Sequence, residues 1–184
     1  MIVLILLAVV VLAGLWAVSV YNGLVRRKTM VAEGWSGIDT QLKRRADLIP
    51  NLVETVKGYA SHESGTFEQL AKLRAQGQGQ SDPAQRAQTE AAITAAIGKI
   101  MAVAEAYPQL RASENFQALQ KDLADIEDQI QMARRYYNGT VRDYNVVIQQ
   151  FPSNLIAGFG NFTPAPFFQA DDADRTVPKV SFGQ

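Results

Sequence analysis

Few residues of this sequence combine a reactive type with a spacing that supports catalysis. The single histidine, His62, stands in the stretch HESGT, which lacks the second histidine of a metalloprotease helix, so we interpret it as a turn residue and not as a zinc ligand. Gly98 and Lys99 have no glycine loop before them and no Ser or Thr after them, so they form no phosphate-binding loop. The chain has no cysteine, which excludes thiolate nucleophiles and cysteine zinc sites. We therefore expect no enzymatic activity, no metal and no cofactor.

The cluster KRRAD, residues 43–47, holds the most informative charged side chain. Arg45 occupies a place in an apolar stripe of alternating three- and four-residue steps, and a guanidinium buried there needs an acceptor. We expect a carboxylate on the last helix, such as Glu127, to provide it. The alternative is an arginine whose stem covers the stripe while its head stays in water. Both interpretations make the cluster architectural.

The stretch YNGTVRDYNVVI, residues 137–148, repeats the phrase Tyr-Asn-x-x-Val/Ile after seven residues. A spacing of seven puts Tyr137 and Tyr144 on one side of a helix, where tyrosine suits a half-buried seam. Asn138 and Asn145 each lie one position further round, where an amide can bond a polar group on a neighbouring helix and fix the register. The alternative is ordinary seam tyrosines beside solvated asparagines.

A membrane anchor is the first element that positions these residues. The first twenty residues carry no charged side chain, and about twenty apolar residues span the roughly 30 Å hydrocarbon core. A cleaved secretion signal is the alternative, but no basic residue precedes the run, which exceeds the usual signal length. We predict a transmembrane anchor over residues 1–25, with Trp16 and Tyr21 toward the headgroup zone.

The charges that follow the anchor predict its orientation. Arg26, Arg27 and Lys28 come at once after the apolar run, and positive residues stay on the cytoplasmic side of a membrane. We therefore predict a single span with the N-terminus outside and residues 26–184 in the cytoplasm.

Apolar spacing predicts an all-α fold, in which the transmembrane helix continues into an antiparallel bundle of long helices arranged up-down-up-down. The stripe of the first helix runs through Pro50 without losing register, which favours a kink over a break capped by Asp47. The antiparallel arrangement sets Trp35 near Tyr137 and Leu42 near Ile130. Three later helices are expected. The second includes residues 67–73, the third starts at Asp82 and Pro83 and is ended by Pro108, and the last runs from Ser113 to Phe151 and is ended by Pro152.

The stretches at residues 33–63, 114–130 and 133–154, together with the anchor, resemble the LemA family of bacterial membrane proteins over nearly the whole chain. The resemblance implies a single-span anchor in the bacterial inner membrane and an all-helical domain with no settled activity. Relatives associated with bacterial organelle membranes imply, by analogy, a part in membrane organisation. The positions that match the family pattern are Trp35, Ile38, Gln41, Arg44, Arg45, Asp47, Pro50, Asn51, Tyr137, Asn138, Tyr144, Asn145, Phe151 and Pro152.

The last segment, residues 153–184, is expected to be a non-helical tail after a bundle domain at residues 26–152. Its four phenylalanines are too apolar for a solvated tail, so we expect them at headgroup depth beside Tyr21, unless they pack on the base of the bundle instead. The acidic run at 171–174 turns the chain away from an anionic surface, and the alternating run at 177–182 adds as a strand to a neighbour or stays mobile. The four are Phe159, Phe162, Phe167 and Phe168.

Charge and the lack of a catalytic constellation limit the function classes. With 18 Lys and Arg against 18 Asp and Glu there is no net charge to attract nucleic acid. We predict a membrane-anchored scaffold that self-associates or organises partners at the lipid bilayer. The alternative is an adaptor or sensor subunit of a membrane enzyme such as a protease.

Overall fold

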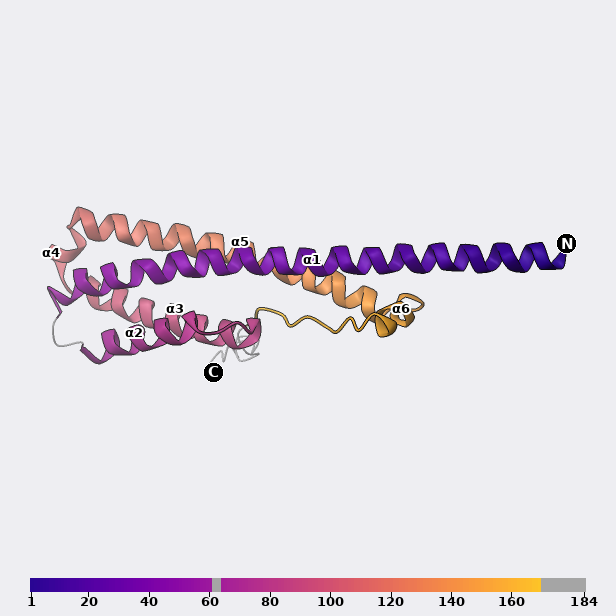
Figure 1. Ribbon diagram of the computed structural model, residues 1–184. Coiled ribbons are helices and arrows are strands. Elements are labelled where there is room, and N and C mark those ends of the chain that lie inside the picture. The colour runs from indigo at the N-terminus through magenta and orange to yellow at the C-terminus, as the bar shows by residue number, and fades with distance from the viewer. Residues whose placement is uncertain (61–63, 170–184) are drawn as a thin grey trace, which may run out of the picture. The chain divides into compact units, whose positions relative to one another are not determined.

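The computed structural model describes residues 1–60 and 64–169, and within these residues it is built of helices alone (Figure 1). The all-α class is thereby confirmed. The chain forms two compact units, unit 1 (Met1–Leu42 with Ile126–Phe167) and unit 2 (Lys43–Asp125 with Phe168–Gln184). The helices are α1 (Ile2–Lys57), α2 (Ser64–Gln78), α3 (Pro83–Glu105), α4 (Pro108–Arg111), α5 (Glu114–Gln149) and α6 (Ser153–Phe159).

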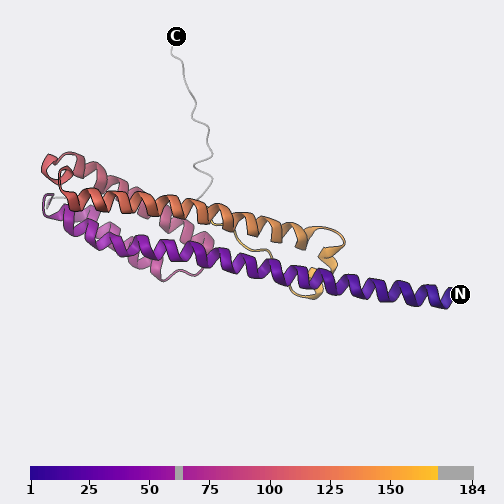
Figure 2. The ribbon, with the colours of Figure 1, turned by 90° about the horizontal axis from the view of Figure 1, so that it is seen from above.

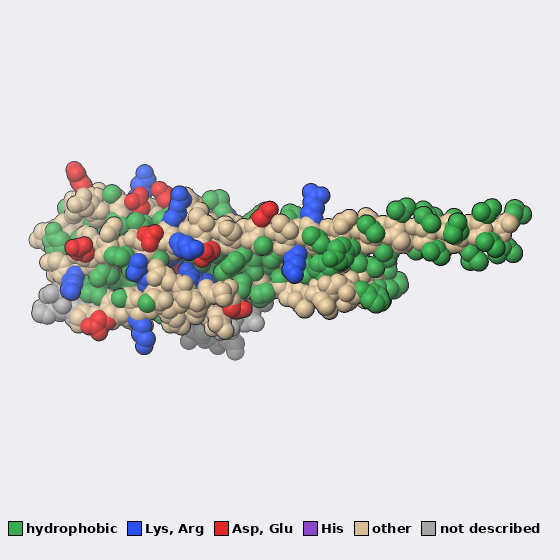
Figure 3. Space-filling model, in the orientation of Figure 1, with side chains coloured by type: hydrophobic (Ala, Val, Ile, Leu, Met, Phe, Trp, Pro, Cys, Tyr) green, Lys and Arg blue, Asp and Glu red, His purple; other side chains and the backbone are tan. Residues whose placement is uncertain are grey.

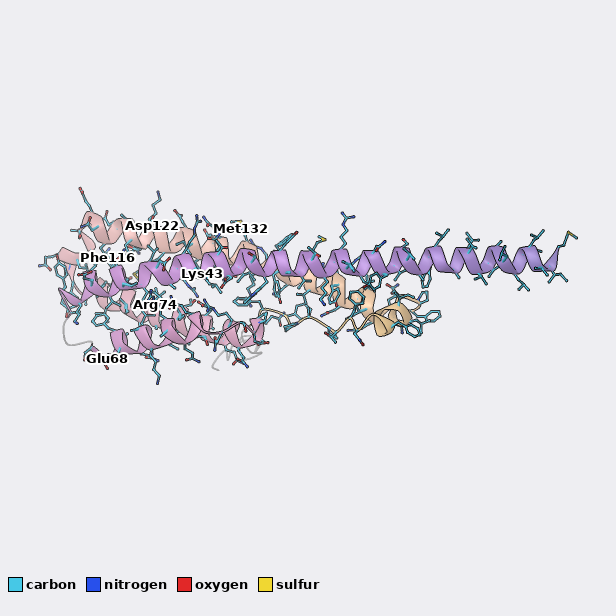
Figure 4. All side chains as sticks on the ribbon, in the orientation of Figure 1. Lys43, Glu68, Arg74, Phe116, Asp122 and Met132 are labelled. Atoms are coloured by element: carbon cyan, nitrogen blue, oxygen red, sulfur yellow. The ribbon has the colours of Figure 1, made fainter. Side chains whose placement is uncertain are left out.

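Helix α1 passes through Pro50 without interruption, so the alternative of a break capped by Asp47 is wrong. A proline inside a helix has no N–H to donate to the carbonyl four residues back, which here is Ala46. Arg74 of α2 fills that place, because its Nε donates to the Ala46 carbonyl oxygen at 2.7 Å (Figure 4). The helix therefore keeps this buried carbonyl satisfied without a backbone donor.

Unit 2 is a packed aliphatic core. Helices α2 and α3 lie side by side in both ribbon views (Figures 1 and 2). Asp82 caps α3 as expected, since its Oδ1 accepts from the Gln85 amide at 2.8 Å. Phe67 and Leu70 of α2 pack into the core. Its other buried members are Ile49, Leu52, Val56, Ala60, Ile93, Ala96, Ile100, Ala104, Leu110, Phe116, Leu119 and Leu123.

Unit 1 pairs the part of α1 that follows its apolar start with the second part of α5 in antiparallel fashion. The rings of Trp35 and Tyr137 lie 5.8 Å apart between centroids, which confirms the expected contact. A Cβ at Gly34 would lie 3.2 Å from the Tyr137 Cα, so the two backbones approach closely there. Trp35 is half-buried, so its loss should cost less than the 3–5 kcal/mol typical of a fully buried aromatic. The Leu42–Ile130 pairing stays a prediction.

The apolar start of α1 is the membrane-span candidate. Among the described residues, one helix is long and apolar enough to cross a membrane, and none of that window is buried. Figure 3 shows this end of α1 covered with hydrophobic side chains. The finding agrees with the anchor predicted over residues 1–25.

The end of α5 and the first part of the tail differ from expectation. Helix α5 ends at Gln149, so Phe151 leaves the helical stripe and is 75 % exposed. The Ser153 hydroxyl lies 2.6 Å from the Val147 carbonyl oxygen and 2.8 Å from that of Gln150, which also accepts the Asn154 amide at 2.8 Å. The short helix α6 then forms where a non-helical tail was expected. The acidic run at 171–174 and the run at 177–182 lie outside the described residues.

Candidate functional site

The repeated tyrosines of α5 hold a segment of the tail that we call the strap, residues 162–167. Tyr137 and Tyr144 are 1 % and 2 % exposed, so they are buried and not half-buried as expected. The Tyr137 hydroxyl donates to the Pro166 carbonyl at 2.8 Å, and the Tyr144 hydroxyl donates to the Thr163 carbonyl at 3.0 Å. A buried phenol needs a hydrogen-bond acceptor, and the strap backbone supplies one to each tyrosine. The strap thus makes the burial of both hydroxyls possible.

Asn145 fixes the middle of the strap with two hydrogen bonds. Its Nδ2 donates to the Ala165 carbonyl at 2.9 Å, and the Ala165 amide donates back to its Oδ1 at 2.9 Å. Ala165 stands between two prolines, which have no N–H, so one side chain satisfies the only backbone donor of that stretch. The expectation that the amide bonds a neighbouring helix is wrong for Asn145. Asn138 is half-buried, and its role stays a prediction.

Burial raises the pKa of the Tyr144 phenol above its usual value of 10.0. The hydrogen bond to the Thr163 carbonyl acts in the same direction, because only the protonated phenol can donate it. The raised pKa thus keeps the Tyr144 phenol as a hydrogen-bond donor to the strap backbone.

The four tail phenylalanines do not act together. Phe162 lies beside Tyr21, with its ring edge-on to Tyr21 at 5.5 Å between centroids, and Lys28 Nζ lies 5.9 Å from the same ring centroid. Its depth in a membrane stays a prediction. Phe159 is 89 % exposed and Phe167 is 38 % exposed. Phe168 is buried and belongs to unit 2. Packing on the protein thus accounts for Phe162 and Phe168, and leaves Phe159 facing outward.

Unit 2 contains a buried ion cluster around Arg45, which is 3 % exposed. The alternative of an arginine with its head in water is therefore wrong. Arg45 Nη2 pairs with the Glu90 carboxylate, and Nη1 donates to Thr94 Oγ1 at 2.8 Å. Arg86 Nε lies 2.7 Å from the other Glu90 oxygen. One buried carboxylate thus joins two buried guanidiniums.

Glu90 and Arg86 were not predicted as buried residues, although the sequence carries a signal for both. Both continue the apolar stripe of α3 backward from Ile93 in steps of three and four, so they occupy core positions as Arg45 does in α1. Glu127, the expected partner, accepts from the Gln131 side chain at 2.9 Å, and its link to Arg45 stays a prediction.

Both sites use their polar groups in contacts within the protein. Across residues 1–60 and 64–169 no group of three or more His, Cys, Asp or Glu side chains could hold a metal ion. The ion cluster is enclosed in the core of unit 2, and the tyrosines are covered by the strap. His62 lies outside the described residues. The two sites stabilise structure, one through charge and the other through backbone capture.

The sequence pattern of the LemA family matches residues 34–182. The magnetosome protein MamQ 2 of Paramagnetospirillum magneticum is 25 % identical over 182 residues, which cover 85 % of this chain and 67 % of that protein. MamQ of Magnetospirillum gryphiswaldense is 30 % identical over 81 residues, covering 44 % of this chain and 30 % of the relative. Protein LemA of Metamycoplasma hominis is 24 % identical over 155 residues, covering 84 % and 71 %.

The family match extends over most of the chain and includes both sites. It contains the Arg45 region and α3, the two Tyr-Asn pairs of α5, and the strap. Together with the apolar start of α1, it fits a membrane-associated protein. The chain belongs to the LemA family.

Proposed function

We propose that this protein is a membrane-anchored, non-enzymatic scaffold that lies against the bilayer and self-associates or organises partners there. One observation carries the proposal: the apolar outer side of α6 is exposed next to the end of the membrane span. Leu155 and Phe159 of α6 are 53 % and 89 % exposed, and Phe151 just before it is 75 % exposed.

The inner side of α6 sets its position along α1. Ala157 and Ile156 pack in one cluster with Leu24 and Val20, close to the end of the apolar run. A Cβ at Gly160 would lie 3.3 Å from the Tyr21 ring, so the end of α6 passes directly beside that residue. If the span crosses the bilayer, α6 therefore lies at headgroup level.

An apolar helix face at headgroup level is stabilised by lipid. Aromatic and aliphatic side chains on one side of a short helix insert to about 5–10 Å at the boundary between headgroups and acyl chains. The exposed set Phe151, Leu155 and Phe159 is suited to that depth, whereas Phe162 is already packed against Tyr21. The tail thus helps the anchor to hold unit 1 against the membrane.

The bacterial inner membrane, with the N-terminus outside and the helical domain in the cytoplasm, is the location we propose. The support is the basic group Arg26, Arg27 and Lys28 directly after the span. A reporter that is active only in the cytoplasm, fused after Gln184, tests this orientation. A silent reporter on an intact, inserted fusion would contradict it.

The scaffold proposal draws further support from the two structural sites and from the relatives. The buried charges and the Tyr137 hydroxyl are engaged in contacts within the protein, which supports a structural role for them over a catalytic one. The relatives named magnetosome proteins support, by analogy, a role in organising a membrane structure.

Native purification of the full chain from membranes tests the function. If the protein is a scaffold, we expect large particles made mainly of this chain. If it is an adaptor, we expect a complex with a membrane enzyme in a fixed ratio. The second result would replace the scaffold with the adaptor. Small particles without any partner would contradict both.

Paired serine variants test the part played by α6. Leu155→Ser with Phe159→Ser should lower membrane retention of the domain and reduce particle size. The matched control is Met132→Ser with Tyr136→Ser, since these α5 residues are 55 % and 53 % exposed but lie away from α6 in sequence. Equal behaviour of the two variants would remove α6 from the proposal.

A further inference from the structure

Unit 1 contains a cavity that neither the strap nor the aromatic contacts use. Its volume is about 260 Å³. Arg26, Arg27 and Met30 line it from α1, and Thr140 and Asp143 line it from α5. The lining holds two arginines and one aspartate, so it carries an excess positive charge that favours an anion.

The Arg27 guanidinium extends back along α1 toward the membrane span. Its Nη1 donates to the Gly23 carbonyl at 3.3 Å, one helical turn nearer the span. A Cβ at Gly23 would lie 3.3 Å from the same nitrogen, so the absent side chain leaves room for the guanidinium. The neighbouring Lys28 is placed over the Phe162 ring instead, which leaves the two arginines as the cations of the cavity.

The level of the cavity matches the lipid headgroups. At 1.5 Å per residue, Arg26 lies about 9 Å past Val20, the end of the first twenty uncharged residues. The headgroup layer is about 5–8 Å thick on each side of the hydrocarbon core, and arginine stems extend back toward it. At this level a lipid phosphate is a better candidate for the bound anion than a dissolved anion.

We propose that this cavity binds the phosphodiester headgroup of a membrane phospholipid. The phosphate pairs with Arg26 and Arg27, whose planar guanidiniums match its oxygens. Met30 adds an apolar wall on the side of the cavity that lies further from the span along α1. The inference rests on the membrane placement in the proposed function and adds to it a defined lipid ligand.

The α5 wall suits the other end of such a headgroup. The Thr140 hydroxyl donates to the Tyr137 carbonyl at 2.8 Å, so toward the cavity it offers lone pairs only. The Asp143 carboxylate also accepts hydrogen bonds, and it already accepts one from Arg142 Nε at 3.2 Å. Acceptors on this wall receive the amine or hydroxyl donors that common phospholipid headgroups carry beyond the phosphate.

Native mass spectrometry of the full chain in detergent tests the site by titration with four probes. These are phosphatidylethanolamine, phosphatidylglycerol, diacylglycerol and inorganic phosphate. We expect one retained phospholipid per chain, and at least tenfold weaker binding of diacylglycerol and inorganic phosphate. Equal binding of diacylglycerol would show that the phosphate is not recognised. Equal binding of inorganic phosphate would show that the site is not a lipid site.

Three variants locate the binding. Arg26→Gln with Arg27→Gln, and separately Met30→Trp, which fills the cavity without changing charge, should each weaken phospholipid retention at least tenfold. Arg134→Gln with Arg135→Gln removes the same charge from α5 outside the cavity and should leave retention unchanged. Equal loss in this control, or full retention in both cavity variants, would overturn the proposal.

The outcome is separable from that of the scaffold experiment. Large particles of a chain that retains no phospholipid would overturn the headgroup site alone. Phospholipid retention by a chain that forms no particles would overturn the scaffold alone.

Discussion

Units 1 and 2 both contain buried polar groups, but they satisfy them by different means. In unit 2 the Glu90 carboxylate joins the guanidiniums of Arg45 and Arg86, so charged side chains on α1 and α3 satisfy one another. In unit 1 the side chains of Tyr137, Tyr144 and Asn145 bond the backbone of the strap. The core of unit 2 therefore depends on ion pairing, and the seam of unit 1 depends on a segment that follows α6.

The difference teaches where each unit is vulnerable. Removing one member of a buried charge cluster leaves desolvated charge behind, which costs far more than the loss of one neutral hydrogen bond. Releasing the strap exposes the tyrosine seam to water, which can replace the lost hydrogen bonds. We therefore expect large effects on stability in unit 2 and local effects in unit 1.

Glu90→Ala should give the largest effect. The two guanidiniums of Arg45 and Arg86 would lose their shared carboxylate in a dry core, at a cost of about 3–5 kcal/mol in the free energy of unfolding. Urea unfolding of the full chain measures it. The triple variant Arg45→Met, Glu90→Leu, Arg86→Met should recover most of the loss, because it removes all three charges. A wild-type midpoint for Glu90→Ala would show that the cluster does not need its carboxylate.

Asn145→Ala should release the strap at a cost of about 1–3 kcal/mol, because it removes two hydrogen bonds to Ala165. Amide hydrogen exchange should quicken at Ala165 and around Tyr144, with little change in unit 2. The control is Asn154→Ala, at an exposed asparagine of α6. Unchanged exchange at Ala165 would mean that Asn145 does not hold the strap.

Arg74→Met should cost about 1–2 kcal/mol, because the Ala46 carbonyl loses the donor that replaces the N–H missing at Pro50. In a Pro50→Ala background the helix supplies its own N–H to this carbonyl, so the same change should cost less. A double-mutant cycle by urea unfolding measures the coupling. Equal costs in both backgrounds would separate Arg74 from the proline.

The smallest expected effect is the pH dependence of Tyr144. Because the folded-state pKa is raised above 10.0, the unfolded chain loses this proton first as the pH rises. The contribution to stability is complete below pH 10 and is lost from there up to the folded pKa. Tyr144→Phe should flatten this alkaline slope in pH-dependent melting. A slope that survives in the variant would assign it to another group.

Helical periodicity explains which parts of this structure could be predicted. The long stripes of α1 and α5 predicted the class and the antiparallel pairing of Trp35 with Tyr137. They also put Arg45 on the apolar stripe, but left open whether its head is buried or in water. The same rule applied to the charged residues of α3 would have predicted Glu90 as a core member. These features depend on spacing, which is visible in one chain.

The strap and α6 could not be predicted in the same way. Thr163 to Pro166 has no periodicity, and its partners are reached through backbone atoms that every residue has. Helix α6 spans Ser153–Phe159, too short for a repeating stripe, and its formation depends on packing against Leu24. The Tyr-Asn repeat predicted a seam and a polar contact of the asparagine amides with a neighbouring helix, and only the fold showed that Asn145 bonds the strap instead.

The position of Phe159 relative to the bilayer tests the central claim most directly. The chain has no cysteine, so Phe159→Cys and the control Met132→Cys each accept a single spin label in the full protein. In reconstituted bilayers, the label at 159 should be accessible to oxygen and shielded from a water-soluble relaxation agent, whereas the label at 132 should show the reverse. Equal exposure of both labels to the water-soluble agent would contradict a scaffold held against the membrane by its tail.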